Sequence, residues 1–315
     1  MMHALSDGIH PSREELIGLR LPARNLPLKP RQPVQGVMAG SHASPFRGRG
    51  MDYVESRGYQ SGDDVRNMDW RVTARSGRAH VKVYQDERER PVVVMADFGP
   101  GMFFATEGVF KSIVAARAAA LIAWAAAHNG DRIGALLYNG NHHEIRPLRG
   151  QRGALQLIRA LVAAADPSGA GSRPQPGGNP FNAALTRLRR VVRPGSLVYM
   201  LSDFYHLDSD GKCHLQWLRR HNDIVACQIL DRLELAPPPP GRYPVMAGDR
   251  RAVLDMHAAT QREAWTRHFD ERRQRVGELM RQCAIPLFQL GTADDISQRL
   301  RQILSQSGTT ETAAA

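Results

Sequence analysis

Continuous apolar runs of strand length recur along the chain. The clearest are residues 91–96, PVVVMA, and residues 196–201, SLVYML. Short runs of this kind are typical of strands that are buried on both faces of a parallel sheet. Further strands are expected from apolar or alternating patterns at residues 80–86, 132–138, 142–146, 223–230 and 285–290, with a small hairpin at 243–246 and 251–254.

Segments of helical length separate these strands. Residues 110–128 are rich in alanine, and their longest apolar stretch, residues 118–127, falls well short of the ~18 residues needed to span a bilayer. This stretch therefore predicts a buried helix. Near the N-terminus, Ser12 and Glu15 have the spacing of a capping box. Helices are expected at residues 12–19, 110–128, 153–165, 180–192, 212–220, 260–283 and 296–304.

The alternation of strands and helices predicts an α/β fold with a mostly parallel sheet and helices on both faces. Asn139-Gly140 is a hairpin signal, which adds one antiparallel strand at an edge. Residues 20–50 are rich in Pro, Gly and Arg and predict irregular structure. We therefore expect an N-terminal extension over residues 1–79, an α/β domain over 80–304 and a disordered tail over 305–315.

A dense cluster of charges surrounds a tryptophan shortly before the strands begin. Because a buried charge without a partner costs several kcal/mol, we expect these carboxylates and guanidiniums to pair and to clamp the extension onto the sheet. A partner-docking surface is the next interpretation. An acid–base site is less favoured, since neighbouring arginines would keep the carboxylates ionised. The cluster consists of Asp63, Asp64, Arg66, Asp69, Trp70, Arg71 and Arg75.

The same segment carries a family resemblance. It follows the pattern Y-x-x-G-D-D-x-R-x-x-D-W-x-x-x-A-R, and so resembles the bacterial domain-of-unknown-function 58 family, in which this pattern precedes a von Willebrand factor A-like domain. The resemblance covers roughly residues 35–240 and extends beyond them only by strand order. It implies a von Willebrand factor A-like, Rossmann-type fold. The matching residues, expected to form the structural clamp, are Tyr59, Gly62, Asp63, Asp64, Arg66, Asp69, Trp70 and Arg75, together with Ala74.

The resemblance also implies a place for a metal ion. Von Willebrand factor A domains hold Mg²⁺ or Mn²⁺ through D-x-S-x-S, a threonine from a second loop and a later aspartate. Here Asp97 and Asp203 remain, whereas Gly99 and Gly101 stand in place of the serines and Asn179 in place of the threonine. Because three hydroxyl ligands are lost, we expect a degenerate site without a metal and a protein without a cofactor. A weakened Mg²⁺ site completed by waters is the alternative.

Other motifs of catalysis are missing from the sequence. It contains no P-loop, dinucleotide fingerprint or nucleophile elbow. The adjacent His142 and His143 would point to opposite faces of a strand. The cysteines Cys213, Cys227 and Cys283 form no C-x-x-C pair, which favours reduced thiols. The N-terminus has no signal-peptide pattern. We therefore expect a non-enzymatic protein in the cytoplasm, with no membrane span.

The formal net charge is +11, which would suit nucleic acid, an anionic membrane or an acidic protein. Aromatic residues make up 6% of the chain and do not interleave with basic ones, so the stacking platforms of a nucleic-acid binder are not expected. Within residues 260–283, arginines and acidic residues have helical spacing, and we expect them to neutralise one another locally.

These patterns favour a protein-interaction module, and the resemblance implies a MoxR-type AAA+ ATPase as its partner. Ligands of open α/β sheets bind at the carboxyl ends of the strands, so we expect the partner there. The alternatives are a divalent-metal-dependent adhesion-type binder and a basic nucleic-acid-binding protein. Phe98, Phe104 and Phe204 are expected as exposed anchors, although Phe98 and Phe204 are also candidates for burial under the loops. The expected partner-binding residues are Asp97, Phe98, Gly99, Gly101, Asn179, Asp203 and Phe204.

Overall fold

The computed structural model describes residues 7–28, 51–86, 90–139, 141–167, 178–247 and 250–306. The chain divides into two compact units, which are described separately. The large unit comprises Met1–Pro30 and Arg90–Ala315, and the small unit comprises Arg31–Glu89. Most of the tail expected at residues 305–315 lies outside the described residues, as do Gly140 of the predicted hairpin signal and most of residues 20–50.

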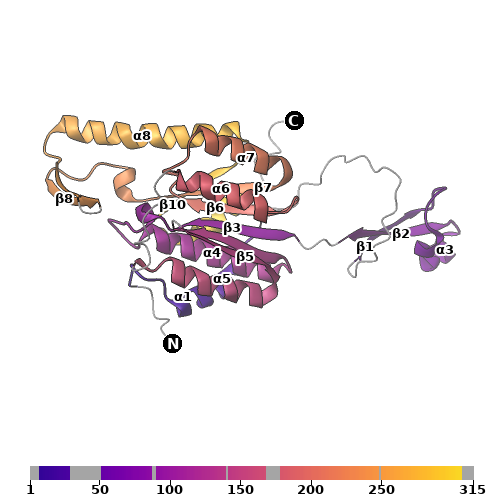
Figure 1. Ribbon diagram of the computed structural model, residues 1–315. Coiled ribbons are helices and arrows are strands. Elements are labelled where there is room, and N and C mark those ends of the chain that lie inside the picture. The colour runs from indigo at the N-terminus through magenta and orange to yellow at the C-terminus, as the bar shows by residue number, and fades with distance from the viewer. Residues whose placement is uncertain are drawn as a thin grey trace. The chain divides into compact units, whose positions relative to one another are not determined.

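A six-stranded sheet forms the centre of the large unit, in the order β10-β7-β6-β3-β4-β5 (Figure 1). All neighbouring strands are parallel except β4 and β5, which are antiparallel. This arrangement confirms the predicted mixed α/β class and its antiparallel edge strand. The strands are β3 (Pro91–Asp97), β4 (Arg132–Tyr138), β5 (His142–Arg149), β6 (Leu197–Ser202), β7 (Asp223–Leu230) and β10 (Leu287–Gly291).

Helices cover both faces of this sheet (Figure 1). Alternate residues of β3 point to opposite faces, so Val92 and Val94 pack into one core and Val93 and Met95 into the other. The first core is completed by α1 (Arg13–Gly18), α2 (Arg20–Ala23), α4 (Lys111–His128), α5 (Gly150–Ala164) and α9 (Ile296–Gln306), and the second by α6 (Pro180–Val191), α7 (Ser209–His221) and α8 (Ala259–Gln282). The short hairpin of β8 (Arg242–Ala247) and β9 (Arg250–Asp255) precedes α8.

The N-terminal helices are part of the large unit. Ser12 caps α1 by accepting a hydrogen bond from the Glu15 backbone, as the capping-box spacing predicts. Leu16 is buried in the first core, where its carbonyl accepts a 3.0 Å hydrogen bond from the Trp124 indole of α4. The Glu15 carboxylate of α1 forms a 2.6 Å ion pair with Arg117 of α4. The predicted extension over residues 1–79 is therefore wrong at its start, because residues 7–28 complete the core of the α/β domain.

The small unit is built around an antiparallel pair, β1 (Met51–Gly58) and β2 (His80–Asp86). Between the two strands lie a 3₁₀ turn, η1 (Val65–Asn67), and a short helix, α3 (Trp70–Ser76). The strand expected at residues 80–86 does form, but it pairs with β1 instead of joining the main sheet. The predicted domain start at residue 80 is corrected accordingly, since the large unit resumes at Arg90.

None of the described helices is both long and apolar enough to cross a membrane. Helix α4 resembles a membrane-spanning helix in its apolar composition, because it is rich in alanine and is buried along most of its length. Its apolar surface is covered by the sheet and by neighbouring helices of the large unit.

Candidate functional site

The carboxyl ends of β3 and β6 lie side by side where the sheet topology switches direction. Strand β3 pairs with β4 on one side and with β6 on the other, and this is the position at which open α/β sheets bind ligands. The Ser202 hydroxyl at the end of β6 donates a 2.7 Å hydrogen bond to Asp97 at the end of β3. The Asn179 amide donates to the His206 carbonyl at 2.5 Å. The ends of β3 and β6, the loop after β6 and the start of α6 therefore come together at this edge of the sheet.

Asp97 is buried and satisfied by local donors. Its Oδ1 accepts a 2.8 Å hydrogen bond from the Gly99 backbone, and its Oδ2 accepts the bond from Ser202. Burial raises the pKa of Asp97 to about 6, and the negative charge of nearby Asp203 adds to the rise. The Tyr138 phenol is buried beside this carboxyl group, and burial together with the Asp97 charge raises its pKa well above the usual value. Asp97 therefore holds its proton to a higher pH than an ordinary aspartate, although it is mostly ionised at pH 7.

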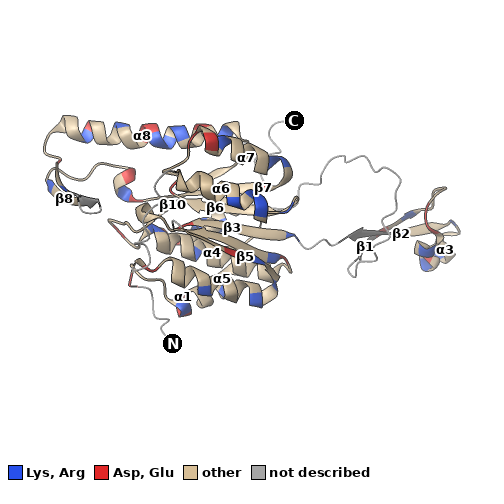
Figure 2. Ribbon diagram, in the orientation of Figure 1, with Lys and Arg blue, Asp and Glu red and all other residues tan. Residues whose placement is uncertain are grey.

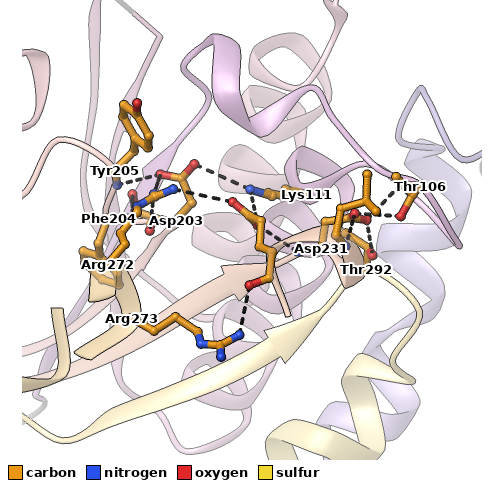
Figure 3. A network of polar contacts seen from close by, with 12 residues as sticks. Thr106, Lys111, Asp203, Phe204, Tyr205, Asp231, Arg272, Arg273 and Thr292 are labelled. Atoms are coloured by element: carbon orange, nitrogen blue, oxygen red, sulfur yellow. Dashed lines mark hydrogen bonds and ion pairs between the residues drawn. The ribbon is translucent and has the colours of Figure 1, made fainter. Parts of the chain in front are cut away.

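Asp203 is held between two cations. The Lys111 ammonium, on the first turn of α4, lies 3.6 Å from Oδ2, and the Arg272 guanidinium, from α8, lies 3.8 Å from Oδ1 (Figure 3). Arg272 also donates a 3.2 Å hydrogen bond to the Asp203 carbonyl, while the Tyr205 backbone donates to Oδ1 at 2.8 Å. Asp203 and Lys111 are both nearly inaccessible to solvent.

Glu234 contacts the same two cations. Its Oε2 lies 2.6 Å from the Lys111 ammonium, and its Oε1 lies 3.6 Å from Arg272. The Glu234 carbonyl accepts a 2.9 Å hydrogen bond from Arg273 (Figure 3). Two buried carboxylates are thus balanced by two cations, as burial in a medium of low dielectric constant requires. We call this set, Lys111, Asp203, Glu234 and Arg272, the ion-pair network.

Asp231 extends the polar contacts to the ends of β7 and β10. It accepts hydrogen bonds from the Thr106 backbone (2.8 Å), the Thr106 hydroxyl (2.7 Å) and the Thr292 hydroxyl (3.0 Å) (Figure 3). Burial alone would raise the pKa of Asp231, but these hydrogen bonds outweigh it and lower the pKa. Its backbone N–H donates to Glu234 at 2.9 Å, which joins Asp231 to the ion-pair network.

The residues present do not fit the metal-ligand set that the fold family implies. A cation already contacts Asp203, because the Lys111 ammonium lies against it. The Asn179 side-chain oxygen caps α6 by accepting from Phe181 and Asn182, so it is not directed at the two aspartates. In the described part of the chain, His, Cys, Asp and Glu residues form no group of three or more that could hold a metal ion. The metal-free state therefore stays a prediction. The Lys111 ammonium gives a physical reason for it, because it already places a positive charge beside Asp203.

The glycines of the first loop bring the backbone close to both carboxylates. A Cβ atom on Gly101 would lie 3.2 Å from Asp203 Oδ2, and one on Gly99 would lie 3.1 Å from Asp97 Oδ1. Both distances are shorter than ordinary van der Waals contact. A side chain at either position would therefore require the carboxylate to shift.

The expectation that Phe98 and Phe204 are exposed anchors is wrong, and the alternative of burial is correct, because both side chains are buried. Phe204 adopts a positive φ of 54°, which is rare for a bulky residue. Its ring packs edge-on against Phe181, with 5.7 Å between ring centroids. Phe104 is 42% exposed as expected, and Tyr205, which is not among the predicted anchors, is 59% exposed.

Only some of the motif residues in the small unit have a structural role. Asp63 forms a two-armed salt bridge with Arg57, at 2.7 and 2.9 Å. Asp64 caps η1. Asp69 caps α3 through the Arg71 and Val72 backbone N–H groups and accepts a 2.7 Å bond from the Ser56 hydroxyl. These contacts stay within the small unit, in contrast to the predicted clamp onto the sheet.

The expected burial of charge around the tryptophan holds for Asp69, which is 6% exposed, but not for the tryptophan or the arginines of the motif. Trp70 is 67% exposed, and Tyr59 is exposed as well. Among the described residues, Arg66 and Arg75 form no ion pair, and Gly62 serves as a turn residue at φ 106°. The motif therefore uses its aspartates to shape the segment and leaves its tryptophan and arginines at the surface.

This division predicts different outcomes for two neighbouring substitutions. Asp69→Ala should destabilise the small unit by about 1–2 kcal/mol, since it removes a helix cap and a side-chain hydrogen bond. Trp70→Ala should leave stability within about 0.5 kcal/mol of the parent, as is usual for exposed positions. Hydrogen exchange of the amides in residues 51–86 would measure both. Equal loss of protection in the two variants would contradict this assignment.

Comparisons with known proteins find relatives by sequence and more distant similarities by structure. The uncharacterized proteins Rv1480 of Mycobacterium tuberculosis (strain ATCC 25618 / H37Rv) and Mb1516 of Mycobacterium bovis are each 30% identical to this chain over 280 residues, covering 86% of it and 84% of themselves. The crystal structure of the conserved hypothetical protein BatB from Bacteroides thetaiotaomicron is similar at a TM-score of 0.41 and 10% identity, over 70% of this chain and 100% of that one. A von Willebrand factor type A structure from Catenulispora acidiphila gives a TM-score of 0.37 at 10% identity, over 72% and 44%. Such distant structural likeness carries no information about activity.

The family described as "Protein of unknown function DUF58" matches residues 55–275. The matched region includes the charged motif of the small unit and most of the sheet, with Asp97, Asp203, Glu234 and Arg272 among its residues. Since this match covers well over half of the sequence, the chain belongs to the DUF58 family.

Proposed function

We propose that the protein is a non-enzymatic, cytoplasmic protein-interaction module that acts as a partner or adaptor of a MoxR-type AAA+ ATPase. The observation that carries this proposal is the surface at the carboxyl ends of the strands. There, Phe104 and Tyr205 are exposed beside a site whose charged groups are already paired with one another. The family resemblance supplies the kind of partner.

The state of the polar groups supports a non-enzymatic role. A general base or nucleophile must be accessible to its substrate, whereas Asp97, Ser202 and Asp203 are all buried. The Ser202 hydroxyl donates to Asp97 and accepts from the Phe204 backbone at 2.9 Å, so its hydrogen bonds are internal. Such an arrangement stabilises the ends of the strands and offers no free reactive group.

The exposed aromatic groups support a binding role. Tyr205 lies over the Arg272 guanidinium, with 4.2 Å between the guanidinium carbon and the ring centroid. This cation–π contact holds the ring in place before any partner arrives, which lowers the entropic cost of binding. Tyrosine and arginine are also enriched at the centres of protein interfaces. Phe104, from the loop after β3, provides a second aromatic anchor.

The proposal predicts that a Phe104→Ser/Tyr205→Ser double variant binds the ATPase about tenfold more weakly, through loss of two aromatic anchors. Binding would be measured between purified full-length protein and the MoxR-type ATPase of the same organism, with ATP and without it. The matched control is Leu155→Ser on α5, because Leu155 is 42% exposed, as Phe104 is.

Three results would decide the matter. An unchanged dissociation constant in the double variant, with an unchanged melting temperature, would exclude this face as the docking site. A loss of affinity in Leu155→Ser as large as that in the double variant would show a non-specific effect. Failure of the parent protein to bind the ATPase in either nucleotide state would reject the partner itself.

A further inference from the structure

The outward face of α3 in the small unit combines an aromatic ring with two cationic groups. Trp70, Arg71, Ala74 and Arg75 are all exposed, and their spacing of i, i+1, i+4 and i+5 places them on one side of the helix. The other side faces the hairpin, where the Thr73 hydroxyl accepts a 3.0 Å hydrogen bond from the His80 backbone. We call these four exposed residues the α3 face.

The α3 face is held rigid by its surroundings. A helix of seven residues is not stable alone in water, so its conformation depends on contacts outside it. Asp69 caps the first turn, and Gly77, at φ 69°, ends the helix while its N–H donates to the Thr73 carbonyl at 2.9 Å. Because the helix is already fixed, its backbone loses little conformational freedom when a partner binds the exposed side chains.

The charges of the α3 face have no acidic partner of their own. Among the described residues, neither Arg71 nor Arg75 forms an ion pair, whereas the nearby carboxylates Asp63 and Asp69 are engaged by other donors. Figure 2 shows the basic residues of α3 in blue. Arg71 and Arg75 are four residues apart on α3, so the two residues lie about one helical turn from each other.

We propose that the α3 face binds an acidic segment of another protein. Two carboxylates one helical turn apart on that segment would pair with Arg71 and Arg75, and an apolar side chain between them would pack on the Trp70 ring. Arginine binds carboxylates through two parallel hydrogen bonds, and tryptophan and arginine dominate the energetics of protein interfaces. The α3 face belongs to a different unit from the surface proposed for the ATPase, so this proposal does not depend on that one.

The charge balance of the hairpin segment, residues 51–86 of the small unit, favours a protein ligand over nucleic acid. Over residues 51–86, Lys and Arg are matched by an equal number of Asp and Glu. Binding to a phosphate backbone draws on a surplus of positive charge that this segment lacks. A long phosphate backbone would also pass the exposed Asp64 and Glu55, which repel anions, whereas a short acidic segment need only contact the two arginines of the α3 face.

The test uses full-length protein and three labelled probes measured by fluorescence anisotropy. The first is a helical peptide of roughly 20 residues, long enough to be helical in water, with Glu pairs at i, i+4 beside Leu. The second carries Lys in place of every Glu, and the third is a single-stranded DNA oligonucleotide. We expect the parent protein to bind the Glu peptide at least tenfold more tightly than the other two.

The variants assign that binding to the α3 face. Trp70→Ser and the double variant Arg71→Glu/Arg75→Glu should each weaken binding of the Glu peptide about tenfold, and Trp70→Phe should restore most of the affinity. The matched control is Arg78→Glu, which also reverses a charge of the small unit but lies beyond the end of α3. Hydrogen exchange over residues 51–86 would verify that each variant keeps the hairpin.

Each remaining result overturns the proposal. Equal binding of the Glu and Lys peptides, or no binding of either, would exclude an acidic segment as the ligand of the α3 face. Tighter binding of the oligonucleotide that is lost in Arg71→Glu/Arg75→Glu would make the face a nucleic-acid site. Arg78→Glu could also lose as much peptide binding as the double variant does. That result would show that the overall charge of the small unit, and not the α3 face, determines binding.

Discussion

Replacing Lys111 with methionine should lower the free energy of unfolding by about 3–5 kcal/mol, because two buried carboxylates would lose their shared cation. The ammonium lies 2.6 Å from Glu234 and 3.6 Å from Asp203, and all three groups are shielded from solvent. Arg272 would remain, but at more than 3.5 Å from either carboxylate it cannot replace the closer contact. Chemical denaturation at neutral pH would measure the loss.

The control for this substitution is Lys212→Met. Lys212 is half-buried on α7 and forms no ion pair among the described residues, so its loss should change stability by less than about 0.5 kcal/mol. A second variant, Lys111→Met/Glu234→Gln, removes one charge of each sign and should recover part of the stability. If Lys111→Met unfolds at the same denaturant concentration as Lys212→Met, the ion-pair network does not stabilise the fold.

The protein should also gain stability as the pH falls from 7 to 4, relative to an Asp97→Asn variant. The pKa of Asp97 is raised from 3.8 to about 6 in the folded state, by burial and by the Asp203 charge. The folded state therefore binds this proton more tightly than the unfolded state does. The resulting stabilisation is complete below pH 3.8 and is lost as the pH rises through 6. Its full size is about 3 kcal/mol, at 1.36 kcal/mol per pKa unit.

The measurement is the difference in unfolding free energy between the parent and Asp97→Asn at several pH values, so that other titrating groups cancel. A difference that stays constant from pH 4 to 7 would show that Asp97 has an ordinary pKa. Repeating the series with millimolar Mg²⁺ tests the metal alternative. An ion between Asp97 and Asp203 would stabilise the parent at pH 7, increasingly as the Mg²⁺ concentration exceeds its dissociation constant, and would have no such effect on Asp97→Asn.

The sheet was predictable because its strands are buried on both faces. Such strands appear as apolar runs, and a carboxylate directly after such a run is predicted at the carboxyl edge, as Asp97 and Asp203 are. Asp231 follows β7 in the same way and could have been found by this rule. Asp231 is not a position of the metal-site pattern, so that pattern alone gives no reason to expect it in the site.

The ion-pair network was not predictable from local sequence. Lys111 begins a helix of mostly apolar residues, a position where a charge is usually solvated, and its burial depends on elements far away in the chain. Arg272 was expected to pair within its own helix. Along α8, which is described over its whole length, the only ion pair of that kind joins Asp270 and Arg273, while Arg272 reaches the end of β6.

The small unit could not be separated from the sheet by pattern alone. An alternating strand such as β2 has the same periodicity whether it joins a six-stranded sheet or a hairpin. Similarly, the charges around Trp70 suggested burial, because burial is the usual state of tryptophan. The aspartates turned out to be occupied as helix caps and as one salt bridge with Arg57, which is a local role that spacing alone does not distinguish from a buried cluster.

The insertion of the small unit between α2 and β3 affects the order in which the chain can fold on the ribosome. Glu15 and Leu16 leave the ribosome 102 and 108 residues before their partners Arg117 and Trp124. At typical rates of synthesis this is a delay of roughly 5–20 s, during which the entire small unit is made. The first two helices must therefore wait with their apolar sides uncovered, while a hairpin encoded after them can already be complete.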